Sequence, residues 1–123
     1  MPLVSIIIPV YNSEEFLKFS LKSAINQTYK NKEIIVINDG TKNENKIKTI
    51  LDLYKEFPIN YISLKKNMGV SNSLNLGLKK SKGKYICWLS HDDIFMENKI
   101  AEQMKLLNNL KREAIISSNF IQF

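Results

Sequence analysis

The chain has 123 residues, of which 44% are hydrophobic and 24% charged, and its formal net charge is +6. This composition is typical of one folded globular domain and excludes a disordered chain. Arg112 is the only arginine among the 18 basic residues, which argues against a nucleic-acid partner, because readers of DNA and RNA use arginine for bidentate contacts.

The sequence also bears on the compartment of the protein. Its single cysteine, Cys87, lies in an apolar run, which is typical of a buried, reduced thiol. We recognise no signal peptide, and no apolar run approaches the roughly 20 residues that span a bilayer. We therefore expect a cytoplasmic protein, with peripheral association at the inner face of the membrane as an open alternative.

Apolar runs alternate with amphipathic segments along the chain. The runs predict five strands, at Leu3–Val10, Glu33–Asn38, Ile59–Leu64, Tyr85–Leu89 and Ala114–Ser118. Between them, helical periodicity predicts four helices: one opened by a capping box of Asn12 and Glu15, one opened by Thr41 and Glu44, and two over Val70–Lys80 and about Glu97–Leu110.

This order of elements predicts the fold class. Strands that alternate with helices form parallel sheets with helices on both faces, because parallel strands need crossover connections. We see no linker or internal repeat. The sequence therefore predicts a single α/β domain over residues 1–123.

Three predicted strands end in polar residues. The first ends in Pro9–Asn12, the second in Asn38–Thr41 and the fourth in Ser90–Asp93. In open α/β sheets, ligands bind beyond the carboxyl ends of the strands. We therefore expect a site where these three ends meet. The glycine patterns of dinucleotide-binding folds and P-loops are missing after the first strand.

Asp92 and Asp93 are the strongest candidates for site residues. Two adjacent carboxylates repel each other, and a hard divalent cation relieves this repulsion. Mg²⁺ or Mn²⁺ takes one or two carboxylates together with substrate phosphates. The pair therefore predicts a metal–diphosphate site, although an Asp-Asp pair is also compatible with a helix cap and a solvated neighbour.

Other polar strand ends leave two interpretations open. Asp39 either accepts hydrogen bonds from a base or ribose, or belongs to an ordinary Asn-Asp-Gly turn. Tyr11 either stacks on a base or packs in the core. His91, the only histidine, either faces solvent, or coordinates a metal or orients a phosphate.

Four ordered motifs resemble those of family 2 glycosyltransferases, and the similarity covers the chain from residue 4 to about residue 118. The opening signature of that family is similar to Val4–Asn12, its Q-T-Y/F and E-I-I-V-V-D-D-G-S segments to Asn26–Tyr29 and Glu33–Thr41, its N-x-G-v-s…N-x-G stretch to Asn67–Gly77, and its G-x-Y-I…D-x-D-D region to Gly83–Asp93.

The resemblance implies a GT-A fold, a three-layer sandwich around a mainly parallel sheet. It implies sugar transfer with inversion, from a nucleotide-sugar donor of the UDP-sugar kind to a saccharide or lipid-linked acceptor, with Mn²⁺ or Mg²⁺ as cofactor. By the same resemblance, the nucleotide site would be formed by Pro9, Tyr11, Asn12, Asp39 and Asp92. Asp93 would be the direct metal ligand, with Asp92 beside it.

The chain departs from the family pattern at several positions. Asn38 replaces a common aspartate, His91 replaces a frequent first carboxylate, and Ser73-Leu74 replaces a common Ala-Arg. The resemblance places the catalytic base beyond Phe123, in an acceptor-binding half. We therefore expect the chain to supply the donor and metal site and to show little transfer alone.

Two rival functions remain open at the level of sequence. One is a non-catalytic GT-A-shaped module that binds a partner, such as a second copy in a homodimer, through its apolar end, Ile115–Phe123. The other is a nucleotidyltransferase-like enzyme. That class prefers a glycine-rich basic loop after the first strand, which this sequence lacks.

Overall fold

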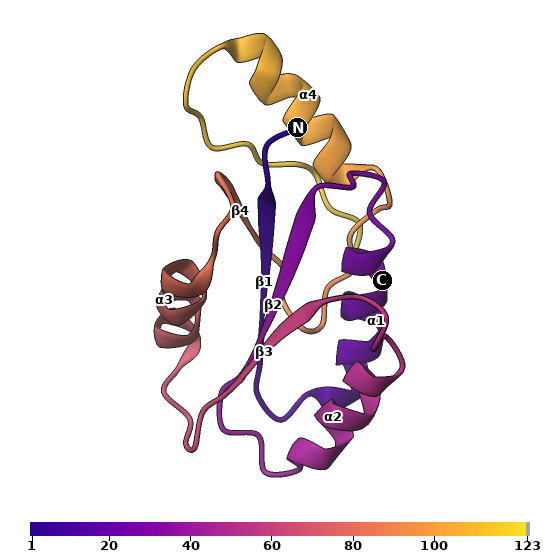
Figure 1. The fold of residues 1–123 in the computed structure, drawn as a ribbon, viewed down its shortest axis with the longest axis vertical. Coiled ribbons are helices and arrows are strands. Elements are labelled where there is room, and N and C mark those ends of the chain that lie inside the picture. Colours follow the sequence, from indigo (N-terminus) through magenta and orange to yellow (C-terminus); the bar gives the residue numbers. More distant parts are fainter. Residues whose placement is uncertain (123) are drawn as a thin grey trace.

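The computed structural model describes residues 1–122, and the last residue, Phe123, lies outside the described part. The elements follow the order β-α-β-α-β-α-β-α (Figure 1). They are β1 (Val4–Val10), α1 (Glu14–Ile25), β2 (Lys32–Asn38), α2 (Glu44–Asp52), β3 (Ile59–Ser63), α3 (Val70–Lys80), β4 (Tyr85–Trp88) and α4 (Lys99–Leu110).

The four strands form one parallel sheet in the order β3-β2-β1-β4. β1 is central, and all of its seven residues are buried. Val4 lies opposite Lys32 of β2 on one side and Tyr85 of β4 on the other. The predicted parallel α/β fold is therefore confirmed, and the apolar run of β1 reflects a strand that is covered on both faces.

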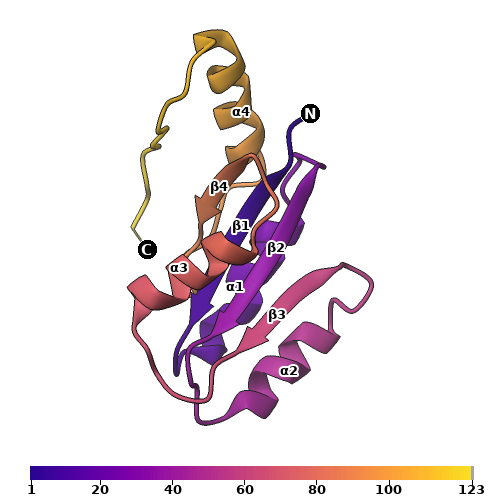
Figure 2. The same ribbon diagram turned by 60° about the vertical axis from the view of Figure 1, so that its left-hand side comes forward.

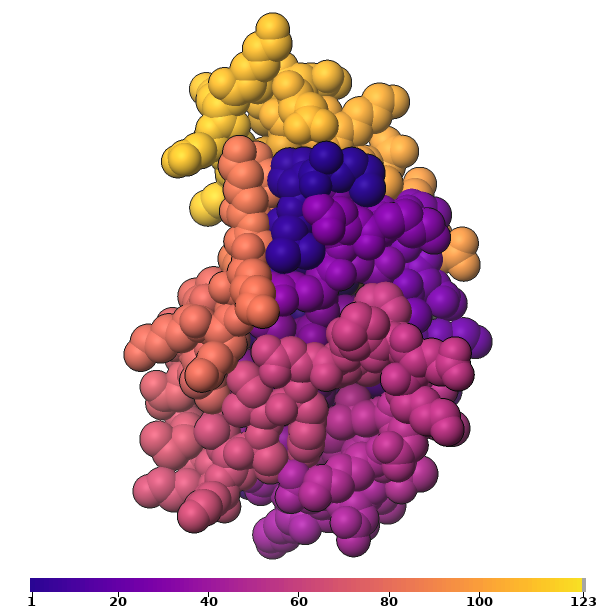
Figure 3. All heavy atoms as spheres, in the orientation of Figure 1, coloured from indigo at the N-terminus to yellow at the C-terminus, as the bar shows by residue number. Residues whose placement is uncertain are grey.

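Helices cover both faces of this sheet (Figure 1). On one face, Ile6 and Ile8 join a core with residues of α1, α2 and α4, among them Leu17, Ile47 and Ile100. On the other face, Ile7, Ile35 and Ile37 pack against α3 through Leu74 and Leu76. The space-filling view shows the indigo amino-terminal residues between the later segments of the chain, as expected for a central first strand (Figure 3).

The predicted fifth strand at Ala114–Ser118 is wrong. Within residues 1–122 this segment pairs with no strand, and it runs past α4 as chain without regular secondary structure (Figure 2). Ile115 is fully exposed, whereas Ile116 packs partly against the core. A strand needs a neighbouring strand for its backbone hydrogen bonds, and none of the described strands offers this segment a pairing.

Two predicted helix caps are also wrong. The residues that precede α1 and α2 are Ser13 and Asn43, and neither caps its helix through its side chain. The backbone N–H of Asn12 instead donates to Thr41 Oγ1 over 3.1 Å. Tertiary contacts between the ends of β1 and β2 thus use the side chain that local spacing had assigned to a cap.

Smaller differences concern element ends and membranes. β4 ends at Trp88 and α4 begins at Lys99, each within two residues of the prediction. None of the helices in residues 1–122 is both long and apolar enough to cross a bilayer.

Candidate functional site

The carboxyl ends of β1 and β2 are joined by hydrogen bonds. Asp39 donates its backbone N–H to the Val10 carbonyl over 2.8 Å. Asn12 has a positive φ of 48° and accepts a bond from the backbone of Lys42 at its Oδ1 over 3.3 Å. Tyr11, between these residues, is 43% exposed. Core packing of Tyr11 is therefore excluded, and its ring is available at the rim.

Asp39 is only 3% exposed, and its carboxylate fixes the loop before α3. Oδ1 accepts the backbone N–H of Met68 over 2.7 Å. Oδ2 accepts the backbone N–H of Gly69 over 3.0 Å and the side-chain amide of Asn67 over 3.1 Å. The Asn-Asp-Gly turn is therefore more than a solvated turn, because its carboxylate ties the end of β2 to the start of α3.

Asn38 lies in a second, buried network. Its Oδ1 accepts the backbone N–H of Thr41 over 2.8 Å, and its Nδ2 donates to the Tyr61 hydroxyl over 3.2 Å. Tyr61 then donates to Glu44 over 2.9 Å. Burial, followed by this bond to Glu44, raises the pKa of Tyr61, which keeps the hydroxyl protonated as a donor. An amide suits this position because Tyr61 has only one proton to give.

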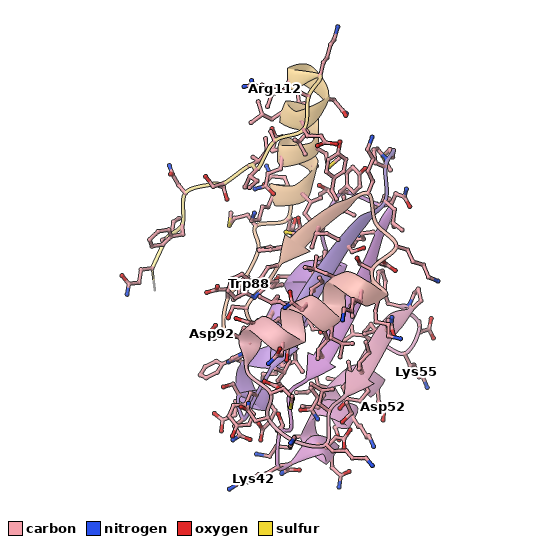
Figure 4. All side chains as sticks on the ribbon, turned by 90° about the vertical axis from the view of Figure 1, so that its left-hand side faces the viewer. Lys42, Asp52, Lys55, Trp88, Asp92 and Arg112 are labelled. Carbon is pink, nitrogen blue, oxygen red and sulfur yellow. The ribbon has the colours of Figure 1, made fainter. Side chains whose placement is uncertain are left out.

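The acidic loop, residues 90–96, starts at the end of β4. Ser90 donates its hydroxyl to Asp92 Oδ1 over 2.7 Å, and this bond lowers the pKa of Asp92. His91 is half-buried, with its Nδ1 3.3 Å from the Pro9 carbonyl, so it is not simply solvent-facing. Asp92 and Asp93 are both exposed. Figure 4 shows Asp92 on the same side of the molecule as Trp88.

These contacts bring the predicted site residues to one rim. His91 connects the acidic loop to the end of β1, and Asn12 and Asp39 connect β1 to β2. Pro9 is buried and contributes its carbonyl oxygen to the contact with His91. The predicted meeting of three polar strand ends is therefore seen in the structure.

Three buried polar residues, two in α1 and one just after it, were not predicted from the sequence. Ser20, Ser23 and Gln27 hydrogen bond to the backbone of the acidic loop and to the start of α4. Ser20 and Ser23 gave a signal, because polar residues at spacing i and i+3 lie on one face of a helix. That face also carries Leu17, Leu21 and Ala24, which we interpreted only as a core stripe.

An apolar hollow of about 270 Å³ adjoins the acidic loop. It is lined by Phe16 and Phe19 of α1, by Ser20, and by Asp92 and Ile94. The two phenylalanines are about half exposed. The hollow places apolar surface next to a candidate metal ligand.

The donor set fits a cation that is shared with a ligand. In residues 1–122 no group of three or more His, Cys, Asp or Glu side chains is arranged to hold a metal by itself. Asp92 keeps Oδ2 outside its bond with Ser90, and Asp93 is exposed beside it. Mg²⁺ and Mn²⁺ suit such a pair of oxygen ligands, because substrate phosphates and water complete the coordination. Burial raises the pKa of the Cys87 thiol, which makes it a poor soft ligand or nucleophile.

Comparison with known sequences decides the family. The family described as Glycosyl transferase family 2 matches residues 5–122. The chain belongs to this family. Its resemblance to family 2, inferred from four motifs, is thereby confirmed.

Proteins similar to this family 2 chain occur in bacteria. It is 50% identical over 115 residues to an uncharacterised glycosyltransferase of Rickettsia prowazekii, covering 94% of this chain and 35% of that protein. It is 36% identical over 113 residues to WfgD of Escherichia coli, a UDP-Glc:alpha-D-GlcNAc-diphosphoundecaprenol beta-1,3-glucosyltransferase, covering 88% of this chain and 43% of that protein. The chain thus spans less than half the length of these two relatives.

Solved glycosyltransferase structures share the fold. A mannosyltransferase of Pyrobaculum calidifontis, in complex with GDP-Man and Mn²⁺, aligns with a TM-score of 0.79 at 18% identity, over 86% of this chain and 32% of that one. TarS of S. aureus, in complex with UDP-GlcNAc, aligns with a TM-score of 0.79 at 20% identity, over 89% and 32%. These likenesses confirm the GT-A fold.

Proposed function

We propose that this chain binds the nucleotide-sugar donor of a family 2 glycosyltransferase at the rim formed by β1, β2 and β4. The whole enzyme would transfer the sugar to an acceptor hydroxyl with inversion. The observation that carries the proposal is the convergence of Asn12, Asp39 and the Asp92–Asp93 pair at one sheet edge, within a chain of this family.

The nucleoside would lie against the ends of β1 and β2. Tyr11 offers an exposed ring for stacking, and Pro9 and Asn12 border the same rim. Asp39 Oδ1 has one hydrogen-bond donor in the structure, and a carboxylate oxygen has room for two. Asp39 can therefore hold its loop and still accept an imide N–H from a uracil-type base.

The diphosphate would lie at the acidic loop. When bound, Mn²⁺ or Mg²⁺ supplies positive charge that stabilises the nucleoside diphosphate leaving group. Asp93 is the residue we assign as direct ligand, and Asp92 as its neighbour at the ribose or metal. Ser90 keeps Asp92 ionised by donating to its carboxylate. No residue in 1–122 is assigned as the base, whose place in an acceptor-binding half stays a prediction.

The proposed donor is a UDP-sugar. TarS was solved with UDP-GlcNAc, and the E. coli relative is named for UDP-Glc and a diphosphoundecaprenol-linked acceptor. These facts belong to those proteins, and they support a nucleotide-sugar donor and a lipid-linked or saccharide acceptor here. The P. calidifontis complex with Mn²⁺ supports a divalent cation.

A second candidate function rests on exposed apolar residues at the end of the described chain. Ile115, Phe120 and Ile121 are each more than four-fifths exposed, and such surface favours a partner. A GT-A-shaped assembly module would form a stable dimer of the 123-residue chain. Light scattering separates the two functions, because the assembly module would be a dimer. A monomer that binds UDP supports the donor site instead.

Calorimetry with UDP tests the proposed function. We expect UDP to bind in the presence of Mn²⁺ and to bind at least tenfold more weakly without it. Asp93→Ala should abolish the dependence on Mn²⁺. Asp52→Ala is the matched control, because Asp52 is an exposed aspartate at the end of α2 (Figure 4). Failure to bind UDP under either condition would refute the proposal.

A further inference from the structure

α1 and the residues that directly follow it carry a polar stripe that is almost fully buried. Ser20, Ser23 and Gln27 are 0%, 9% and 1% exposed. Burying a hydroxyl or amide costs free energy unless the group is hydrogen-bonded. The bonds that these three side chains make therefore show what the stripe does.

Ser20 contacts the acidic loop on both sides of Asp92. Its Oγ lies 2.6 Å from the carbonyl oxygen of His91 and 2.6 Å from that of Asp93. A serine hydroxyl has one proton, so the two carbonyls share it. This single side chain therefore links the peptide group before Asp92 to the peptide group after Asp93.

Ser23 and Gln27 hold the rest of the loop. Ser23 Oγ accepts the backbone N–H of Phe95 over 3.1 Å. Gln27 donates from Nε2 to the Met96 carbonyl over 2.7 Å and accepts at Oε1 from the backbone N–H of Ile100 over 3.0 Å. The loop is thus tied to α1 at its start and middle, and at its end to Gln27, which follows α1.

We propose that Ser20, Ser23 and Gln27 are positioning residues of the donor site, which hold the acidic loop so that Asp92 and Asp93 face the diphosphate-bound cation. This inference rests on the proposed function. Two neighbouring carboxylates repel each other, and a loose loop would let them separate. A loop backbone that is already fixed keeps them together, so less conformational entropy is lost when the cation binds.

Ser20 gives the sharpest test, because it is fully buried and bonds to the backbone on both sides of the carboxylate pair. Ser20→Ala removes only the hydroxyl, and alanine is a better helix former than serine. Loss of groups that orient metal ligands typically lowers metal affinity about 10- to 100-fold. We expect the Kd for Mn²⁺, in the presence of UDP, to rise about tenfold or more.

Ser5→Ala is a matched control. Ser5 is also a fully buried serine, and its hydroxyl bonds with Glu33 and the backbone of Gly83 at the opposite end of the sheet. Its loss should lower stability in a similar way and leave the Kd for Mn²⁺ unchanged. Ser20→Cys keeps the shape of the side chain with a weak donor, and should give an intermediate Kd.

The experiment measures bound Mn²⁺ by electron paramagnetic resonance for the 123-residue chain and its variants, together with chemical denaturation of each. A rise in Kd for Ser20→Ala, with a folded protein and an unaffected Ser5→Ala, supports the inference. An unchanged Kd for both Ser20→Ala and Ser20→Cys overturns it while the proposed function stands. A wild-type chain that binds no Mn²⁺ even with UDP overturns the proposed function itself.

Discussion

The carboxylate of Asp39 holds the backbone of Gly69, with 3.0 Å between Asp39 Oδ2 and the Gly69 nitrogen. This bond joins the turn that follows β2 to Gly69, the residue directly before α3, which begins at Val70. Asn67 and Met68 donate to the same carboxylate. The rim at the carboxyl end of β2 therefore depends on one buried acidic side chain.

Asp39→Ala should destabilise the protein by about 2–3 kcal/mol, because it leaves backbone donors without their charged acceptor. Chemical denaturation followed by circular dichroism measures the loss. Asp52→Ala, which removes an exposed carboxylate, should change stability by less than about 0.5 kcal/mol. Equal stability of the two variants would show that the Asp39 bonds contribute little.

Gly40→Ala should also be costly, because Gly40 has a φ of +78° and lies against another segment. A methyl group there would meet the Asn67 nitrogen at 2.4 Å and the Lys66 carbonyl carbon at 2.5 Å. Since these atoms are backbone, the whole 66–67 segment must move. We expect a loss of at least about 2 kcal/mol, from left-handed strain and the clash together.

Gly69→Ala is the control for strain without the clash. Gly69 has a φ of +91°, and nothing lies within 4 Å of the position of an added methyl group. Both alanine variants should lose stability, but only Gly40→Ala should shift the amide NMR signals of Lys66 and Asn67. The same shifts in both variants would contradict the close packing of Gly40.

Asn38→Asp tests why this chain has an amide where its family commonly has a carboxylate. The change removes the donor to Tyr61 and places a charge at a site that is 1% exposed. We expect a loss of about 1–3 kcal/mol at neutral pH, measured by urea unfolding. Asn60→Asp makes the same chemical change at an exposed position of β3, and should be nearly neutral.

Ser90→Ala should raise the pKa of Asp92, because the Ser90 hydroxyl is the main cause of its lowered pKa. In the wild type, this lowered pKa contributes stability that is fully present above the ordinary aspartate pKa of about 3.9. That contribution is lost as pH falls through the lower, folded value. NMR titration of the Asp92 carboxyl carbon should move to higher pH in the variant. Ser81→Ala, whose hydroxyl bonds to Leu78, should leave the titration unchanged.

Much of the fold could be predicted from local patterns. The run Ile34–Ile37 is apolar and β-branched, and such a run favours a strand that is covered on both faces. Because parallel strands end at the same edge, the meeting of Asn12, Asp39 and Asp92 near one rim followed from the order of elements alone.

What the sequence could not predict depends on distant partners. Thr41 looked like a helix cap, but a backbone N–H from the end of β1 uses its hydroxyl. Ala114–Ser118 has strand-like residues, but propensity does not tell whether a strand with a free edge lies within reach. Ser20 is compatible with a helix and its residue type predicts no function there. Its role appears only when the acidic loop lies against α1.

The central place of β1 has a consequence for how the chain acquires its shape. β1 leaves the ribosome before both of its neighbours in the sheet, β2 and β4, so Val4 must await Tyr85 before its second edge is paired. Pairings between residues so far apart in sequence slow folding. During synthesis, one edge of the most apolar strand therefore stays open until the residues of β4 emerge, and the early part of the chain is the part most in need of protection from aggregation.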